Sequence, residues 1–343
     1  MHKELIMSEL RKTVGVIGLG LIGGSMALDL KKRGFASRTL GVEADPVAAQ
    51  AARTIGLVDE MVSFEDCISR ADIIVVAVPV GAAVKMIPDI LSHFAKEDTL
   101  PSAKKIADAP GIVSPTEKTS DAPGSVPSSA NGPCHSATSC HSERSEESHK
   151  IVIDVCSTKE HICQAVKYHP ARTQFVSTHP MAGTEYSGPW AAQPGLFDGR
   201  ACIIADQEES APWVVQTVLK LYACLNMRPI FMSSSSHDVH TAYVSHISHV
   251  TSFALALTVL DKEKDEKHIF DLASGGFSST VRLAKSNADM WIPILTQNRD
   301  NVLQVMDTYI DKMQQFREAV AGYDEATLRQ LIEEANRIKK IIR

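Results

Sequence analysis

The sequence predicts an α/β protein in which an N-terminal Rossmann-type nucleotide-binding domain precedes an all-helical C-terminal domain. Short apolar segments alternate with amphipathic ones through the first two thirds of the chain. A glycine-rich stretch, VGVIGLGLIGGS, lies at the first strand-to-helix junction, and from about residue 236 onward the hydrophobic period is helical. We therefore place the nucleotide-binding domain at 11–232 and the helical domain at 233–343.

The first half of the nucleotide-binding domain is expected to consist of parallel strands joined by helices. TVGVIG at 13–18 is short, apolar and β-branched, which is typical of a buried strand. The helix after it should end where Lys31, Lys32 and Arg33 precede Gly34. In order, we expect strands at 13–18, 39–43, near 61–63 and at 72–78, and helices at 22–33, 46–55 and 80–94.

The alternation stops at 101–149, a stretch rich in Ser, Pro, Ala and Gly with no hydrophobic period. We interpret it as a disordered insertion in the nucleotide-binding domain. The alternation then resumes with KIVIDVCSTK, which predicts a strand followed by a loop. Further strands are expected at 174–178, 201–205 and 228–232, with a helix at about 211–225.

The last third of the chain is expected to be helical throughout. HDVHTAYVSHISHVTSFALALTVL, which begins at residue 237, predicts one long helix. Shorter helices should follow, then a long helix near 288–320 and a last one from about 324. Gly322 is the stop signal between these two.

Composition excludes several classes of function. The 343 residues carry a net charge of −6 with both signs interspersed, so we expect no nucleic-acid partner. The sequence has no apolar run of the about 20 residues that a membrane helix needs and no signal-peptide core, which predicts a cytoplasmic protein without a membrane partner. Seven cysteines, an odd number, argue against a disulfide framework. The spacing in CHSATSCH fits no usual zinc site, so we expect no metal.

The glycine-rich loop predicts dinucleotide binding. Gly18 permits a tight turn, Gly20 lets the backbone approach a pyrophosphate, and Gly23 lets the helix pack on the strand. The helix that opens at Leu21 and Ile22 directs free N–H groups at the phosphates.

An acidic residue should follow the second strand to bind the ribose hydroxyls. Glu43 lies 20 residues after Gly23, at the predicted end of that strand. A carboxylate there would repel a 2′-phosphate. The sequence therefore predicts NAD rather than NADP as the cofactor.

Two loops after predicted strands could carry chemistry. Ser157 in DVCSTK lies at the carboxyl end of a strand, where ligands bind in parallel sheets, although it could equally cap the next helix. His179 in THPMAGTEYSG would suit a general base in a cofactor cleft, because its ordinary pKa lies near neutrality. A loop histidine is, however, more often structural or exposed to solvent.

Two segments of the helical domain also offer functional side chains. His246 and His249 are three residues apart and share a helical face. They could line a substrate pocket, form a metal site with His240, or make a helix contact, but no nearby carboxylate or cysteine completes a good ligand set. Arg282 in FSSTVRLAKSNADMW could grip a carboxylate at two points, or be an ordinary surface arginine.

Taken in order, these motifs resemble one family, the prephenate and arogenate dehydrogenases of tyrosine biosynthesis. The set comprises GLGLIGGS, VAVP, D-x-x-S-x-K, HPMAGTE, HD…SHxxH and T-x-R-LA…MW, and it covers nearly the whole chain outside 101–149. The resemblance implies a Rossmann domain joined to a helical dimerisation domain, and hence a homodimer. It also places Val78 and Pro79, from VAVP, in the cofactor site.

The resemblance implies roles for individual residues. His179 matches the catalytic histidine and general base, and Ser157 matches a catalytic serine that hydrogen-bonds near the same hydroxyl. Arg282 matches the arginine that holds the ring carboxylate of the substrate. The remaining matches are His246 and His249, which line the substrate pocket, Glu185 and Asp238, an acidic pair near its entrance, and Trp291, a pocket aromatic. Cys156 and Thr158 stand where the family usually has Gly and often has Val.

The implied reaction is the NAD-dependent oxidative decarboxylation of prephenate to 4-hydroxyphenylpyruvate, CO2 and NADH. Arogenate dehydrogenase, with the same chemistry giving tyrosine, is the alternative. Other NAD(P) enzymes of this architecture lack the HPMAGTE and SHxxH combination. A non-enzymatic NADH-binding sensor would need a DNA- or protein-reading module, against which the acidic balance and the lack of a basic helix argue.

Overall fold

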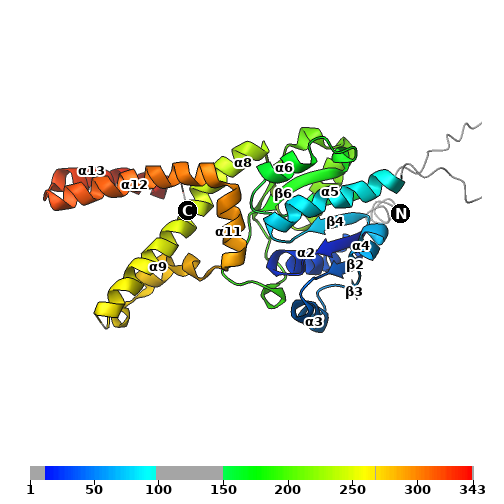
Figure 1. The fold of residues 1–343 in the computed structure, drawn as a ribbon, viewed down its shortest axis with the longest axis horizontal. Coiled ribbons are helices and arrows are strands. Elements are labelled where there is room, and N and C mark those ends of the chain that lie inside the picture. The colour runs from blue at the N-terminus through cyan, green and yellow to red at the C-terminus, as the bar shows by residue number, and fades with distance from the viewer. Residues whose placement is uncertain (1–11, 98–149, 267, 342–343) are drawn as a thin grey trace, which may run out of the picture.

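The computed structural model describes residues 12–97, 150–266 and 268–341, and places an eight-stranded α/β domain beside a helical domain that extends away from it (Figure 1). The strand order is β3-β2-β1-β4-β5-β6-β7-β8, and the predicted fold class is confirmed. The strands are β1 (Lys12–Ile17), β2 (Ala36–Val42), β3 (Glu60–Met61), β4 (Ile73–Val76), β5 (Ile151–Asp154), β6 (Phe175–Pro180), β7 (Ala201–Ala205) and β8 (Arg228–Met232).

Helices cover both faces of this sheet because its strands are apolar on both sides. Val14 and Val16 of β1 pack in one core cluster with side chains of α2 and α7, whereas Ile17 packs in a second cluster with α4, α5 and α6. The short helix α4 was not expected. Ser63 caps it by accepting from the Asp66 N–H at 3.0 Å. The helices are α2 (Leu21–Lys32), α3 (Pro46–Ile55), α4 (Phe64–Arg70), α5 (Val80–Glu97), α6 (Glu160–Val166) and α7 (Pro212–Cys224).

The last two strands of the sheet, β7 and β8, run opposite to the other six and depart from the predicted parallel pattern. All described strand pairs are parallel except β6 with β7, which is antiparallel, with His179 opposite Ile203. A parallel neighbour needs a long crossover, usually a helix. Between β6 and β7 the chain forms only a single 3₁₀ turn (Pro189–Ala191), so β7 enters from the end at which β6 stops.

The helical domain begins where the sequence predicts. Its first helix is continuous from α8 (Ser234–Thr241) through a π-helical segment (Ala242–His246) into α9 (Ile247–Asp265). The expected helix at 288–320 is instead divided at Asn298, whose side chain is occupied by contacts with α8 and the π segment. The other helices are α10 (Gly275–Thr280), α11 (Ala288–Gln297), α12 (Arg299–Ala321), which stops at Gly322 as expected, and α13 (Glu325–Ala335).

The two domains are joined by packing as well as by the chain. Trp291 and Ile294 of α11 are buried in the core cluster that contains α5. Beyond this contact, α9 and the α12–α13 pair diverge from the sheet as two arms (Figure 1). The span Ser234–Lys264 is long and apolar enough to cross a membrane, and only 11% of its apolar window is buried within one chain.

Candidate active site

Most of the predicted site residues lie at one edge of the sheet, where the parallel strands β1, β4, β5 and β6 end. Gly18 follows β1, Val78 follows β4 and Ser157 follows β5. His179 is the last residue but one of β6, which ends at Pro180. The carboxyl edge of a parallel sheet is where α/β proteins bind ligands.

The glycine-rich loop has the shape that a dinucleotide requires. Gly18 has φ +93°, and a Cβ there would lie 2.5 Å from the Ala77 carbonyl oxygen. A Cβ on Gly23 would lie 2.0 Å from the Gly18 carbonyl oxygen, so only glycine lets α2 approach β1 this closely. A Cβ on Gly20 would meet nothing within 4 Å, which leaves open space at the N-terminus of α2. That space is where a pyrophosphate would approach the free N–H groups of the helix.

Glu43 is held against this loop. Its Oε2 accepts the Leu19 N–H at 2.9 Å, and its Oε1 accepts the Asp45 N–H at 3.2 Å. The carboxylate is therefore fixed directly after β2, beside the turn that would carry the pyrophosphate. The position fits a ligand for ribose hydroxyls, and the loop as a whole fits NAD.

A buried ion pair supports the loop that carries Ser157. Lys159 and Asp154 are both fully buried, and their side chains are paired. The Lys159 ammonium also donates to the Thr178 carbonyl oxygen at 2.7 Å, and Asp154 accepts from the Ser177 hydroxyl at 2.8 Å. These bonds tie the end of β5 to β6, which brings the half-buried Ser157 to the same edge as His179.

His179 is bonded to a second histidine that the sequence did not single out. Its Nδ1 lies 2.8 Å from Nε2 of His237, and Nδ1 of His237 lies 2.7 Å from Oδ1 of Asp238. His237 and Asp238 are 1% and 2% exposed, whereas His179 is only partly buried. His237 is the histidine of HD in the motif HD…SHxxH. The sequence shows that motif but does not show that His237 bonds to His179.

His246 and His249 both contact the ring of Trp291. Trp291 stacks on His249 with ring centroids 3.5 Å apart and meets His246 edge-on at 5.9 Å. Asn298 donates to Nδ1 of His246 at 3.1 Å and to the Asp238 carbonyl oxygen at 2.7 Å. The Trp291 indole N–H is buried without a hydrogen-bond partner among the described residues. Asn298 had no signal in the sequence beyond its polarity.

Arg282 is closer to solvent than the histidines and Trp291. Its guanidinium donates to Glu185 at 3.1 Å and remains half exposed. Asp238 lies elsewhere than the resemblance implies, because it is buried rather than near an entrance. Its carboxylate accepts the backbone N–H groups of Lys159 at 2.8 Å and Glu160 at 3.0 Å, at the start of α6. Glu185 and Asp238 therefore have separate partners in this structure.

Burial keeps the histidines of this group neutral near pH 7. It holds the pKa of His179 well below 6.5, with His237, Lys159 and His246 acting in the same direction. Burial likewise lowers the pKa of His237 and His249, and it lowers that of His246 to about 4. Burial acts to raise the pKa of Asp238, but hydrogen bonds from His237 and Glu160 bring it below its usual range.

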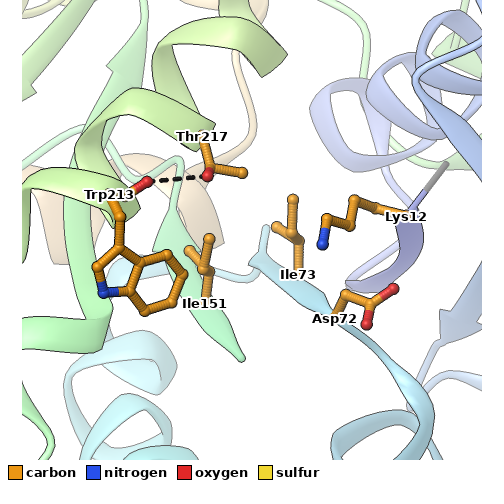
Figure 2. A pocket seen from close by; sticks show the side chains of 6 residues that line it. All are labelled: Lys12, Asp72, Ile73, Ile151, Trp213 and Thr217. Carbon is orange, nitrogen blue, oxygen red and sulfur yellow. Dashed lines mark hydrogen bonds between the residues drawn. The ribbon is translucent and has the colours of Figure 1, made fainter. Parts of the chain in front are cut away.

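Two other features lie away from this group. A cavity of about 110 Å³ opens at the opposite edge of the sheet, where Lys12, Asp72 and Ile151 mark the amino ends of β1, β4 and β5 and Trp213 closes the side (Figure 2). CHSATSCH lies outside the described residues. Within the described ranges, no three His, Cys, Asp or Glu side chains are grouped as metal ligands.

Comparison with known families shows matches over both domains. Residues 26–106 and 133–230 match the family model described as the prephenate dehydrogenase nucleotide-binding domain, and residues 233–334 match that of the prephenate dehydrogenase dimerization domain. The segment that the first match omits lies within 101–149, a stretch outside the described residues.

Individual relatives agree with these matches. The chain is 28% identical to a prephenate dehydrogenase of Bacillus subtilis over 94% of this chain and 74% of the relative. Among solved structures, it is similar to a prephenate dehydrogenase from A. aeolicus in complex with hydroxyphenyl propionate and NAD+, with a TM-score of 0.72, 22% identity and coverage of 96% and 98%. A Synechocystis arogenate dehydrogenase has a TM-score of 0.64 and 23% identity, with coverage of 96% and 99%. At these identities the solved structures support the fold.

Proposed function

This chain belongs to the prephenate dehydrogenase family, and we propose that it catalyses the NAD-dependent oxidative decarboxylation of prephenate to 4-hydroxyphenylpyruvate, CO2 and NADH. It is an NAD-dependent oxidoreductase with a family match in both of its domains. The observation that carries the proposed chemistry is the position of His179. A neutral imidazole lies at the same sheet edge as a glycine loop shaped for a dinucleotide, beside a cluster of hydrogen-bond donors.

The cofactor residues are assigned from the loop geometry. Bound NAD supplies the hydride acceptor. Glu43 would hold the ribose hydroxyls, since its carboxylate is fixed after β2. The pyrophosphate would lie over the open space at Gly20. The full set that we propose is Gly18, Gly20, Leu21, Ile22, Gly23, Glu43, Val78 and Pro79.

His179 acts in this proposal as the general base. When hydride leaves the ring carbon that bears the hydroxyl, the C–O bond gains carbonyl character and the hydroxyl proton must leave. A neutral imidazole accepts that proton, and we assign to Ser157 a hydrogen bond with the same oxygen. The C–CO2 bond then breaks and its electrons enter the ring, which becomes aromatic as the ketone oxygen becomes a phenolate. The phenolate takes back the proton from His179, which returns the imidazole to its neutral form. Base catalysis of this kind is typically worth about 10²–10⁴-fold in rate.

The donor cluster explains how an anionic substrate could be held. Because Nδ1 of His246 accepts from Asn298, the proton of this neutral ring is on Nε2, which leaves an N–H donor. The Trp291 N–H, which has no hydrogen-bond partner among the described residues, is a second donor next to it, and Arg282 adds a guanidinium. We assign Arg282 to the ring carboxylate, with His246, His249 and Trp291 lining the pocket and Glu185 bordering it.

A single assay tests this function. Purified protein with NAD should form NADH on addition of prephenate, with release of CO2 in equal amount. Arogenate, which carries an amino group in place of the side-chain keto group, would react through the same residues. The ratio of kcat/KM for the two substrates therefore decides between prephenate and arogenate dehydrogenase. Absence of NADH formation with both substrates would refute the proposed function.

Arg282→Gln should raise the KM for substrate by about 10- to 100-fold, with a smaller change in kcat, because a charged hydrogen bond contributes about 1.5–3 kcal/mol. Steady-state kinetics at saturating NAD measure this. Lys285→Gln removes an exposed positive charge from the same 3₁₀ turn, Arg282–Lys285, and should leave KM close to that of the unsubstituted protein. A KM unchanged in Arg282→Gln would count against the carboxylate assignment.

The kcat/KM profile should lose activity only at acidic pH. Protonated His179 cannot accept a proton, so activity falls as the pH drops through its pKa. Burial, the Lys159 ammonium, His237 and His246 all lower that pKa, and the Asp238 carboxylate is hydrogen-bonded to His237 rather than to His179. We expect kcat/KM to stay level down to pH 6.5 and to fall below it. Parallel measurements of NAD affinity control for cofactor loss, and a limb centred above pH 6.5 would contradict the assignment.

We also propose that the protein is a soluble, cytoplasmic homodimer formed through its helical domain. Large apolar side chains on the two diverging arms are exposed in one chain, among them Leu257 at 60% and Ile310 at 57%. A second copy that covers them would also account for the apolar, little-buried span Ser234–Lys264.

Light scattering should give twice the mass of one chain for the unsubstituted protein, and the double substitution Leu257→Glu, Ile310→Glu should shift it toward the monomer. Charges at these apolar positions would have to be desolvated in the interface, which is unfavourable. Lys220→Glu, an exposed charge change on α7, should not alter the mass. A monomeric unsubstituted protein would overturn the proposal.

A further inference from the structure

A continuous hydrogen-bonded chain leads from a buried carboxylate to the histidine at the site. Asp238 Oδ1 lies 2.7 Å from His237 Nδ1, and His237 Nε2 lies 2.8 Å from His179 Nδ1. The His237 ring makes these two hydrogen bonds through its two nitrogens, and it is 1% exposed. The rings of His179 and His237 meet edge-on, with centroids 5.1 Å apart.

The carboxylate sets the direction of every proton along this chain. Ionised Asp238 can only accept, so Nδ1 of His237 carries the hydrogen. A neutral imidazole has one N–H, and Nε2 of His237 therefore presents a lone pair. That lone pair accepts from Nδ1–H of His179, which leaves Nε2 of His179 unprotonated. The tautomer with its proton on Nδ1 is the less favoured form of a free histidine side chain, so the surroundings must select it.

We propose that His237 and Asp238 are positioning residues that hold His179 in the tautomer whose free Nε2 faces the substrate hydroxyl. The inference rests on the proposed function for its substrate, but the tautomer itself is a property of the protein alone. When His179 takes a proton on Nε2, its Nδ1–H remains bonded to His237. The positive charge that forms is then stabilised by a dipole ending on a carboxylate, an arrangement that acts like the carboxylate of a Ser-His-Asp triad.

Asp238 also makes hydrogen bonds outside this hydrogen-bonded chain, and for that reason we test the proposal with variants of His237 rather than of Asp238. It accepts the backbone N–H groups of Lys159 and Glu160, so replacing it also disturbs the start of α6. Among the described residues, the His237 side chain bonds only to His179 and Asp238. Substitutions of His237 therefore test the orientation of His179 without disturbing the start of α6. His237→Gln can donate to Asp238 through its amide N–H and accept from His179 through its amide oxygen, in the order that the imidazole uses. His237→Phe keeps a ring of similar size and removes both bonds.

The decisive experiment compares these two variants in the full-length protein. We expect His237→Phe to lower kcat by at least about tenfold, toward the about 10⁴-fold that loss of the correct tautomer costs in a Ser-His-Asp triad, with KM and NAD affinity unchanged. His237→Gln should recover most of that loss. Equal losses in both variants, or a kcat near normal in His237→Phe, would overturn the proposal.

A spectroscopic measurement tests the tautomer without substrate. In protein with ¹⁵N-labelled histidine, the His179 signals, assigned by their loss in His179→Asn, should report a hydrogen on Nδ1 and a lone pair on Nε2. In His237→Phe they should shift toward the Nε2–H form, and in His237→Gln they should not. An Nε2–H tautomer in the unsubstituted protein would refute the inference. Because this readout needs no turnover, failure of the prephenate assay would not be mistaken for failure of the relay.

Discussion

Replacing His179 with asparagine is expected to lower kcat by about 10²–10⁴-fold, the range that a single general base contributes. The asparagine amide cannot accept the substrate proton at physiological pH. Its N–H can still donate to Nε2 of His237, so the bond to the buried pair is preserved and the fold should be retained. NADH formation at saturating prephenate and NAD measures the loss.

Two controls make this result specific to the base. NAD affinity, followed by fluorescence titration, should be unchanged because His179 lies outside the glycine loop. The melting temperature should stay close to that of the unsubstituted protein. A turnover within about threefold of normal would remove His179 from the proton-transfer step.

The second large effect concerns two glycines three residues apart in the same loop. Gly20→Ala should leave the fold intact, because the added methyl group meets nothing within 4 Å, yet raise the Kd for NAD by about tenfold or more. The methyl group would occupy the space that a pyrophosphate needs, and a tenfold change corresponds to about 1.4 kcal/mol. Calorimetric titration with NAD measures this Kd.

Gly23→Ala should act on the fold instead. Its methyl group would lie 2.0 Å from the Gly18 carbonyl oxygen and 2.9 Å from Ala77 Cβ, so β1 and α2 must separate. We expect the free energy of unfolding to fall by about 1–3 kcal/mol or more, as for other overpacked cores. Gly276→Ala, which also meets nothing within 4 Å but lies in α10, is the matched control for both effects. Similar melting temperatures for Gly20→Ala and Gly23→Ala would contradict this division.

The parts of the fold that the sequence predicted are those encoded in neighbouring residues. The strand, glycine turn and helix around Gly18 follow one another directly, and the helix stop at Gly322 is a local signal. The family resemblance rested on the order of several such local motifs. Both domain matches confirm it.

What the sequence did not predict depends on contacts between distant residues. Asn298 interrupts a helical pattern because its side chain bonds across to Asp238 and His246, some 50 to 60 positions away. His237 of α8 reaches His179 of β6 only in the folded chain, in which β7 pairs antiparallel with β6 and the chain then continues into α8. The burial of Asp238 against the start of α6 was likewise not predicted, because the HD motif alone does not indicate which distant element its carboxylate meets.

The link between His237 and His179 has a mechanical consequence. It joins the first helix of one domain to a strand of the other, and Trp291 on α11 is anchored in the core beneath α5. Rotation of one domain away from the other about the segment near 233 would break the His237–His179 hydrogen bond and expose the Trp291 indole ring to solvent. We therefore expect a ligand to enter and leave beside Glu185 and the half-exposed Arg282 without separation of the two domains.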